Sequence, residues 1–378
     1  MTACGGEPKS TLRVRLLQDS IPPVLLSQYK KQVSGEIGLD FIPAAQLQNI
    51  FTQLQTWQQQ PASQTNQGLN LPFFGNKQQD AAISDLVTLG DYWLAPAIAQ
   101  KLIQPIDIDK LNQWPELPPR WQAVVKRDPT GNIDPNGQVW GAPYRWGSTV
   151  IIYRVDKFKD LGWQPTDWGD LWRPELRDRI SLLDQPREVI GLTLKKLGHS
   201  YNTEDLATVP DLKPELQRLH ASVKLYSSDA YLQPLILGDT WVAVGWSTDI
   251  LPLLQRYSNL AAVIPASGTA LWADLWVRPA GKTESPNSNS DHLLSQWIDF
   301  CWQPAIVPQL SLRTKAGSPM LSNLNPQDLP KPLRNNPLLL PEPDILQNSE
   351  FIQPLPSEVA QQYQDLWLEI RRSSIGHS

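Results

Sequence analysis

The chain has 378 residues, of which 41% are hydrophobic and 19% charged, and its formal net charge is -5. This length suits two lobes better than one compact core, and the composition is that of a globular protein. A negative chain without a Lys/Arg cluster lacks the basic surface that nucleic-acid binding needs, and no apolar run in it is long enough to cross a membrane.

Residues 1–11 are predicted to form a flexible tether. Their sequence Thr2-Ala3-Cys4-Gly5-Gly6 places a small residue, a Cys and a Gly as at the cleavage point of a bacterial lipoprotein signal. We therefore expect Cys4 to be lipidated; the alternative is a chance Cys in a flexible terminus. The second cysteine, Cys301, lies in an apolar helical segment and is expected to be an inert buried thiol.

The first half of the chain alternates strands and helices. Strands are predicted over 12–17, 39–42 and 82–89, and helices over 22–31, over 44–58 and from about Asp91. Residues 59–80 are rich in Gln, Asn, Pro and Gly and predict an inserted loop. This β-α-β-α-β order is typical of a doubly wound α/β sheet.

The second half repeats the βα rhythm. Strands are predicted over 148–153, 180–184, 241–246 and 261–264, and helices over 167–172, 187–197, 293–302 and 357–372. Gly198 is expected to close the helix before it, and Ser357 to cap the last helix. The Pro-rich segment 318–356 is expected to be mostly irregular.

The usual catalytic motifs are missing from the sequence. The four histidines show no metal-ligand spacing, and neither a phosphate-binding Gly-rich loop nor a nucleophile elbow occurs. We therefore predict a protein that is not an enzyme and that needs neither a cofactor nor a metal.

Carboxylates beside aromatic residues recur at predicted strand ends, where open α/β sheets bind ligands. The four combinations are Asp91-Tyr92-Trp93, Asp184-Gln185-Pro186-Arg187-Glu188, Trp246-Ser247-Thr248-Asp249 and Trp272-Ala273-Asp274. Trp272 and Asp274 project the same way on an extended segment. A carboxylate flanked by aromatic faces suits an organic cation. Alternatively, Glu188 only complements a helix dipole and Trp246 is a core residue.

Several segments of the middle third resemble the periplasmic spermidine/putrescine-binding proteins of ABC importers. They are 141–147 (GAPYRWG), 168–174 (WGDLWRP), 187–189 (REV), 194–198 (LKKLG), 245–247 (GWS) and 271–274 (LWAD). The resemblance covers about residues 12–372. It implies a type II periplasmic-binding-protein fold, with two α/β lobes joined by hinge strands. Lobe 1 would comprise 12–147 and 273–324, and lobe 2 would comprise 148–272 and 325–375.

The resemblance also implies a ligand site in the cleft between the lobes. In that family, aromatic side chains sandwich the polyamine methylenes and carboxylates hold its ammonium groups. The residues at corresponding positions are Tyr92, Asp184, Gln185, Glu188, Trp246, Trp272 and Asp274. This chain departs from the family at Leu17 and Ser20, which stand where the family has Trp and Tyr, at Gln185 in place of a carboxylate, and at Gly90 in place of a serine.

The leading hypothesis is capture of a small organic cation, such as spermidine or putrescine, for an ABC permease. The protein would be a periplasmic monomer held at a membrane only by its lipid. One alternative is another small ligand, which would be an anion if Arg145 or Arg187 faces the cleft. Further alternatives are a sensor or scaffold without a ligand, and a glycan-active enzyme using Glu188 and Asp274 as paired carboxylates.

Overall fold

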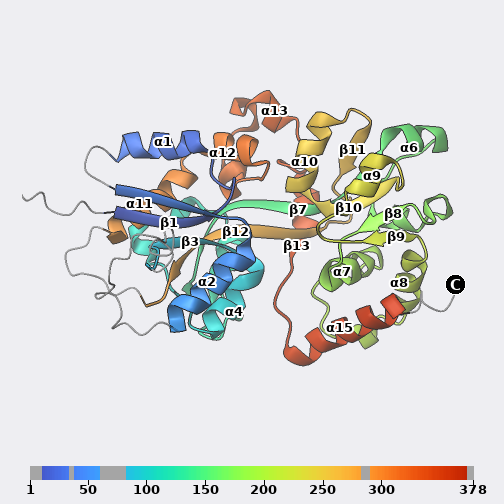
Figure 1. The fold of residues 1–378 in the computed structure, drawn as a ribbon, viewed down its shortest axis with the longest axis horizontal. Helices are drawn as coiled ribbons and strands as arrows, with labels where there is room; N and C mark the ends of the chain where they lie inside the picture. Colours follow the sequence, from blue (N-terminus) through green and yellow to red (C-terminus); the bar gives the residue numbers. More distant parts are fainter. Residues whose placement is uncertain (1–10, 34–37, 60–81, 282–289, 373–378) are drawn as a thin grey trace, which may run out of the picture. The chain divides into compact units, whose positions relative to one another are not determined.

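The computed structural model describes residues 11–33, 38–59, 82–281 and 290–372. The chain divides into two compact units: unit 1 comprises residues 1–146 and 273–330, and unit 2 comprises 147–272 and 331–378. The chain crosses between the units inside two strands, β7 (Ala142–Arg154) and β12 (Ala270–Pro279), and again after Pro330 (Figure 1). The sequence analysis expects the chain to pass from one lobe to the other after residues 147, 272 and 324. The boundaries between the two units lie after residues 146, 272 and 330.

Unit 1 is built on a mixed sheet. The strands β2 (Gly38–Ala44) and β3 (Leu86–Gly90) pair in parallel with β1 (Thr11–Leu17), and β12 pairs antiparallel with β3. The short β4 (Ile103–Gln104) pairs with the end of β12, and β5 (Lys126–Arg127) pairs with β6 (Gln138–Val139). The apolar side chains of β1 at Leu12, Val14 and Leu16 are all buried, so its alternating pattern forms one side of the core.

Helices cover both faces of this sheet, with α1 and α12 on one side and α2 and α4 on the other (Figure 1). Their bounds are α1 Pro23–Gln32, α2 Leu47–Gln59, α4 Leu94–Ala99, α5 Pro119–Val125, α11 Ser290–Trp302 and α12 Val307–Thr314. The 3-10 turns are η1 Asp91–Trp93, η2 Ile108–Lys110, η3 Trp114–Glu116, η7 Pro319–Asn323 and η8 Pro326–Asp328. Aromatic packing supports the core: Tyr144 stacks on Trp276 at 4.2 Å, and Tyr29 meets Trp297 edge-on at 4.9 Å.

The sheet strands of unit 2 are arranged around the second part of β7. β11 (Leu260–Val263) and β10 (Val242–Trp246) pair antiparallel with β7, and β8 (Ile180–Leu182) joins β10 to β9 (Val223–Tyr226). The short β13 (Glu350–Phe351) pairs in parallel with Ala270 and Leu271 of β12. The residues of β10 up to Gly245 are buried, and Trp246 at its end is half-buried.

The helices of unit 2 pack around this sheet, with α7, α8 and α15 together on one face (Figure 1). Their bounds are α6 Val155–Leu161, α7 Pro186–Lys196, α8 Leu212–His220, α9 Gln233–Leu237, α10 Ser247–Arg256, α13 Lys331–Arg334, α14 Pro343–Asn348 and α15 Ser357–Arg372. The 3-10 turns are η4 Trp168–Trp172, η5 Pro174–Leu176 and η6 Leu206–Thr208. Helix α15 buries Tyr363, Trp367 and Ile370, which are spaced four and three residues apart on one face.

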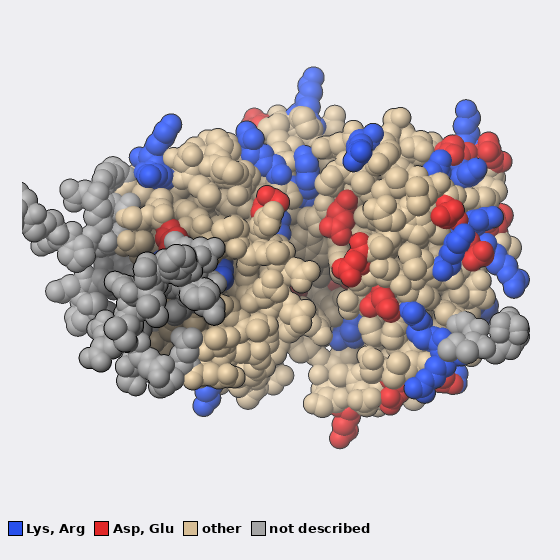
Figure 2. All heavy atoms as spheres, viewed as in Figure 1, with Lys and Arg blue, Asp and Glu red and all other residues tan. Residues whose placement is uncertain are grey.

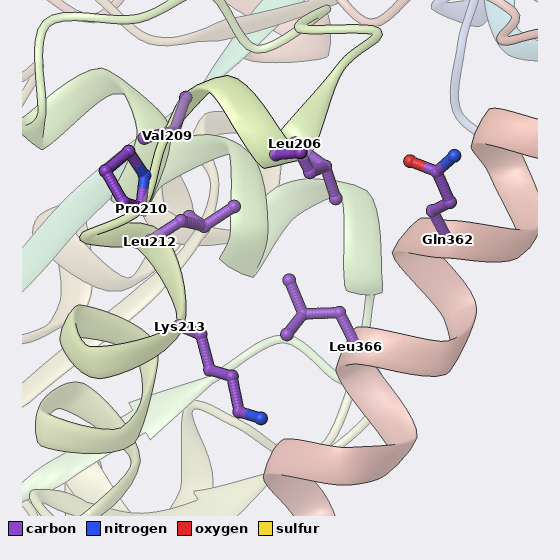
Figure 3. A pocket seen from close by; sticks show the side chains of 8 residues that line it. Leu206, Val209, Pro210, Leu212, Lys213, Gln362 and Leu366 are labelled. Atoms are coloured by element: carbon purple, nitrogen blue, oxygen red, sulfur yellow. The ribbon is translucent and has the colours of Figure 1, made fainter.

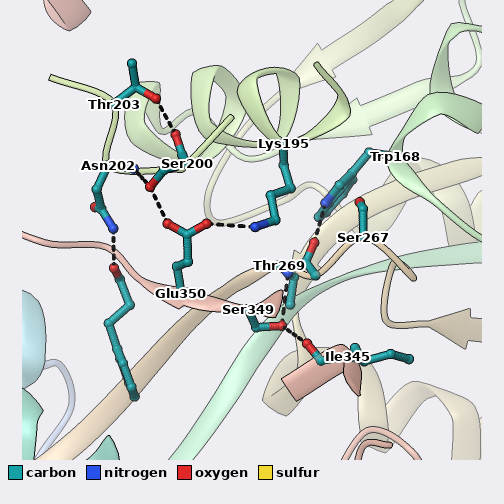
Figure 4. Close-up of polar contacts among 12 residues, drawn as sticks. Trp168, Lys195, Ser200, Asn202, Thr203, Ser267, Thr269, Ile345, Ser349 and Glu350 are labelled. Atoms are coloured by element: carbon teal, nitrogen blue, oxygen red, sulfur yellow. Dashed lines mark hydrogen bonds and ion pairs between the residues drawn. The ribbon is translucent and has the colours of Figure 1, made fainter. Parts of the chain in front are cut away.

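The segment around β13 is tied to unit 2 by polar contacts (Figure 4). Glu350 forms an ion pair with Lys195 of α7 at 2.7 Å and also accepts a hydrogen bond from Ser200. Ser349 Oγ accepts the backbone N–H of Thr269 at 3.1 Å. These contacts hold the returning chain against unit 2, so its Pro-rich sequence is ordered by tertiary partners.

Most elements predicted from periodicity are confirmed, with several corrections. Residues 318–356 are not mostly irregular, since they contain η7, η8, α13, α14 and β13. The predicted strand 148–153 is the second part of a longer strand, and 168–172 is a 3-10 turn. The helix predicted from residue 44 starts at Leu47, because Ala44 is the last residue of β2. The strand predicted from residue 82 starts at Leu86. Ser357 is the first residue of α15.

Other expectations concern the helix ends, the cysteines and the loop. Gly198 follows α7 with a φ of 81°, a conformation that glycine adopts without strain and that confirms its role as a stop. Cys301 is buried and unpaired, and burial raises the pKa of its thiol far above the ordinary value, as expected for an inert cysteine. Cys4 and the predicted loop 59–80, except Gln59 at the end of α2, lie outside the described residues.

Candidate functional site

Glu188 is a buried carboxylate in the first turn of α7 in unit 2. Pro186 opens this helix, and the backbone N–H of Glu188 bonds to the carbonyl of Gln185 at 3.1 Å. The hydroxyl of Thr149 on β7 lies 3.0 Å from each carboxylate oxygen and donates to the carboxylate. The indole Nε1 of Trp246 donates to Oε1 at 3.4 Å. The carboxylate is therefore held by two neutral donors.

Burial is the main influence on the charge of Glu188. It raises the pKa of Glu188 to about 7, and the hydrogen bonds from Thr149 and Trp246 and the charge of Arg187 only partly offset this effect. Within the described ranges, no Lys, Arg or His side chain forms an ion pair with Glu188. A positively charged group beside this carboxylate would compensate the negative charge of its ionised form.

Tyr231 and Trp246 lie beside this carboxylate in the same unit. The Tyr231 hydroxyl accepts the backbone N–H of Trp246 at 3.2 Å and donates to Asp249 at 3.0 Å, and the two rings meet at 83°. This packing requires Gly245, because a Cβ there would lie 1.9 Å from Cε2 of Tyr231. The missing side chain of Gly245 thus allows the Tyr231 ring to pack directly on the strand backbone next to Trp246.

Trp272 reaches the same part of unit 2 through the backbone at Gly147. A Cβ at Gly147 would lie 2.3 Å from the Trp272 ring and 2.6 Å from the Ser247 hydroxyl. Ser247 follows Trp246, and its Oγ accepts the backbone N–H of Ser148 at 3.2 Å. Trp272 is half-buried, and its Nε1 has no hydrogen-bond partner among the described residues.

These contacts group five residues of unit 2, which we call the Glu188 cluster: Thr149, Glu188, Tyr231, Trp246 and Trp272. Three of them, Glu188, Trp246 and Trp272, are residues that the sequence predicts as ligand contacts. Aromatic faces beside a buried carboxylate suit an organic cation.

The predicted residues Asp184 and Gln185 lie just before α7 and are exposed. Asp184 forms an ion pair with Arg371 of α15 at 3.0 Å, so its charge already has a partner. Gln185 precedes the helix as its N-cap residue, and its side-chain amide donates to Ser228 at 3.4 Å. Neither side chain contacts the Glu188 carboxylate through any hydrogen bond of the described residues.

Asp274 belongs to unit 1, where it pairs with Arg145. The Nε of Arg145 on β7 donates to Oδ2 of Asp274 on β12 at 2.5 Å, and the two residues are 8% and 2% exposed. Burial alone would lower the pKa of Arg145, but the charge of Asp274 and its hydrogen bond outweigh that effect and raise it. The guanidinium therefore stays charged and serves as the counter-ion of Asp274 inside the protein.

Asp91 and Tyr92 follow β3 in unit 1. Asp91 is buried and accepts the backbone N–H of Ala273 at 3.0 Å. Burial, together with the negative charge of Asp274, raises the pKa of Asp91 to about 7 despite two backbone hydrogen bonds and the charge of Arg127. Tyr92 is 60% exposed, which leaves its ring available to a ligand.

Sequence reasoning missed Thr149, Tyr231 and the pairing of Arg145 with Asp274. Thr149 gave a signal, since it is a hydroxyl residue inside an apolar strand beside the 141–147 motif. Tyr231 gave none, because its contact with Trp246 depends on the tertiary fold and on the missing side chain of Gly245.

A surface pocket elsewhere in unit 2 contains none of the predicted ligand residues (Figure 3). It has a volume of about 270 Å³. Its lining comes from the η6–α8 region and α15: Leu206, Ala207, Val209, Pro210, Leu212, Lys213, Gln362 and Leu366.

The described residues contain no group of three or more His, Cys, Asp or Glu side chains that could hold a metal ion. Nor does any helix in this part of the chain have both the length and the apolar character to cross a membrane. On the face seen in Figure 2, basic and acidic side chains are scattered among uncharged residues.

Comparisons with known proteins agree on one class. The spermidine/putrescine-binding periplasmic protein 1 of Haemophilus influenzae is 29% identical over 267 residues, which is 71% of this chain and 69% of that protein. The spermidine/putrescine-binding periplasmic protein of Escherichia coli is 26% identical over 354 residues, covering 93% and 89% of the two chains.

A solved structure with the same fold is the spermidine/putrescine ABC transporter substrate-binding protein of Streptococcus pneumoniae. It superposes with a TM-score of 0.77 at 22% identity and covers 96% of this chain and 99% of that one. This likeness confirms the predicted α/β fold of periplasmic binding proteins. Residues 81–349 match the sequence pattern of one family. The chain belongs to the bacterial extracellular solute-binding proteins.

Proposed function

We propose that this chain is the solute-binding component of an ABC importer and that it captures a small organic cation. Spermidine and putrescine, the ligands named for its relatives in Haemophilus influenzae and Escherichia coli, are the first candidates. The observation that carries the proposal is the Glu188 carboxylate, which is buried among neutral donors and aromatic rings without a positive partner in the described residues.

The physical argument is one of charge compensation. A buried carboxylate is costly when ionised, and Glu188 accordingly has a pKa raised to about 7. A ligand ammonium beside it would restore the ionised form and gain a charge-assisted hydrogen bond. The ring faces of Trp246 and Trp272 would cover the methylene groups and add cation–π attraction.

The other predicted ligand residues have different parts in this proposal. Tyr92 offers an exposed aromatic ring from unit 1. Asp184 would bind an ammonium only in competition with Arg371. Gln185 offers an amide rather than a charge, so it would serve a neutral part of the ligand.

The setting of the protein is part of the same proposal. We propose a periplasmic monomer that delivers its ligand to an ABC permease and is anchored through a lipidated Cys4. Mass spectrometry of the N-terminal peptide from membrane-extracted protein tests the anchor: a diacylglyceryl group on Cys4 supports it, and an unmodified Cys4 contradicts it.

Titration calorimetry tests the ligand class. The protein is unfolded and refolded to remove any bound ligand, and is then titrated with spermidine, putrescine and an uncharged diol of matched length. We expect saturable binding of at least one amine and none of the diol. An absence of binding for every amine would refute a cation-capturing function.

A further inference from the structure

Strand β10 reaches the Glu188 cluster with a strand neighbour on one side only. It pairs with β7 along its whole length, from Val242 to Trp246. Its pairing with β8 covers only Val242 and Ala243 in the part of the chain that the structure describes. The last residues of β10 therefore form a free edge, where a backbone N–H that is shielded from water needs another acceptor.

Tyr231 occupies this free edge of β10. Its ring packs on the backbone of Gly245, where a Cβ would lie 1.9 Å from the ring. Its hydroxyl accepts the backbone N–H of Trp246 at 3.2 Å and donates to Oδ2 of Asp249, in the first turn of α10, at 3.0 Å. Because Tyr231 is only 2% exposed, these two groups rather than water hold its hydroxyl. One hydroxyl thus joins the last residue of the strand to the first turn of the next helix.

Trp246 forms the corner between β10 and α10, and its indole extends from this corner to Glu188. Its backbone is still extended, with a φ of -80° and a ψ of 136°, and Ser247 begins the helix. The indole Nε1 donates to Oε1 of Glu188 at 3.4 Å, which is longer than the usual length of about 2.9–3.0 Å. A bond of this length tolerates little further displacement, so the position of the Trp246 backbone decides whether it forms.

The Tyr231 hydroxyl keeps its proton in this setting. Burial raises the pKa of Tyr231 far above its ordinary value, and the negative charges of Asp249 and Glu188 raise it further. The hydroxyl can therefore donate to Asp249 and accept from Trp246 at the same time. Titration of Tyr231 near neutral pH does not interrupt these two hydrogen bonds.

We propose that Tyr231 is a positioning residue for ligand capture and that it acts through Trp246. Its hydroxyl fixes the corner between β10 and α10, and this holds the Trp246 indole at hydrogen-bond distance from Glu188. The inference deepens the proposed function and rests on it, since the Glu188 cluster is the proposed cation site. All of the contacts that carry it lie within unit 2.

A double-mutant cycle separates this role from a general loss of packing. Tyr231→Phe keeps the ring and removes the hydroxyl, so titration calorimetry should show an increase of about threefold in the Kd for spermidine or putrescine. Trp246→Phe removes the indole N–H and should raise the Kd about fivefold. In the double variant no indole is left to position, so the Kd should stay about fivefold above that of the wild type. Independent effects would multiply to about fifteenfold, and that result, or an unchanged Kd in Tyr231→Phe, would overturn the inference.

The ligand-free protein gives a second readout. Burial raises the pKa of Glu188 to about 7, and the hydrogen bond from Trp246 is one of the contacts that oppose this rise. Loss of that bond in Tyr231→Phe should therefore raise the pKa of Glu188 further. The same substitution in the Trp246→Phe background should leave it unchanged. NMR titration of the Glu188 carboxyl carbon measures both, and an equal pKa in the wild type and Tyr231→Phe would contradict the inference.

The matched control is Tyr153→Phe on β7 of the same unit. Tyr153 is also buried, and its hydroxyl donates to Gln164 at 3.3 Å, so its loss should change neither the Kd nor the Glu188 pKa. If Tyr231→Phe does not fold, 4-fluorophenylalanine at position 231 fills the space of the hydroxyl without donating to Asp249, and it must give the same results. Failure of every amine to bind contradicts the proposed function, and the NMR titration then decides alone whether Tyr231 positions Trp246.

Discussion

Replacing Glu188 by Gln should weaken ligand binding and at the same time stabilise the ligand-free protein. The variant keeps the size of the side chain and an acceptor oxygen for Thr149 and Trp246, but it removes the charge. Losing one partner of a buried charge pair costs about 3 kcal/mol, which is roughly a 100-fold increase in Kd for an amine. Titration calorimetry at pH 8.5 measures this change.

The effect on stability follows from the pKa of Glu188. Burial raises it from 4.5 to about 7, so the folded protein binds more protons than the unfolded chain between these values. The free energy of unfolding of the ligand-free protein therefore falls as the pH rises through this window, by about 3 kcal/mol in all. Glu188→Gln removes this loss, so it should be more stable than wild type by about 3 kcal/mol at pH 8.5 and nearly equal at pH 4.

The matched control is Glu215→Gln on α8 of the same unit. Glu215 is also buried, but Lys196 at 2.6 Å and Arg218 at 3.0 Å compensate its charge. This variant should lose stability and keep the wild-type Kd. Urea unfolding at both pH values gives the free energies. Destabilisation of Glu188→Gln at pH 8.5 with an unchanged Kd would show a purely structural Glu188 and refute the reasoning.

Three further predictions concern the same cluster. Affinity for an amine should fall as the pH drops from 8.5 to 5.5, with a midpoint near the Glu188 pKa of about 7, and calorimetry should find Glu188→Gln insensitive over this range. Gly245→Ala should lower the free energy of unfolding, measured in urea, by about 1–3 kcal/mol, because the new Cβ would lie 1.9 Å from Tyr231. Its control is Gly169→Ala, which has open space around it and should change the free energy of unfolding little. Trp246→Phe removes one hydrogen bond to Glu188, so the Kd for an amine should rise about fivefold, which corresponds to about 1 kcal/mol of binding free energy. A rise no larger than that of Gly169→Ala would contradict a role of this hydrogen bond in binding.

Local patterns were enough to predict most of the fold. The alternation in β1 and the spacing of Tyr363, Trp367 and Ile370 in α15 are signals within one element, and both elements form as expected. Residues 318–356 were wrongly predicted to be mostly irregular because their helices are only four to six residues long and their strand has two. Such elements depend on partners distant in sequence, as Glu350 does on Lys195.

In the candidate site, too, local signals were predicted and contacts between residues distant in sequence were not. Glu188 and Trp246 were predicted from their position at strand ends beside aromatic or acidic residues, and the structure brings them together at 3.4 Å. The pairing of Asp274 with Arg145 joins residues 129 positions apart and leaves no local mark in the sequence. A sequence can therefore identify a carboxylate of this kind but does not show whether the protein already supplies its counter-ion.

The central claim is that a ligand cation neutralises Glu188, and the proton count on binding tests it most directly. At pH 7 Glu188 is about half protonated, so binding of an amine that stays protonated should release about half a proton. Calorimetric titration in two buffers of different ionisation enthalpy measures this number. The account predicts release by the wild type and none by Glu188→Gln; no release by the wild type, or equal release by both proteins, would contradict it.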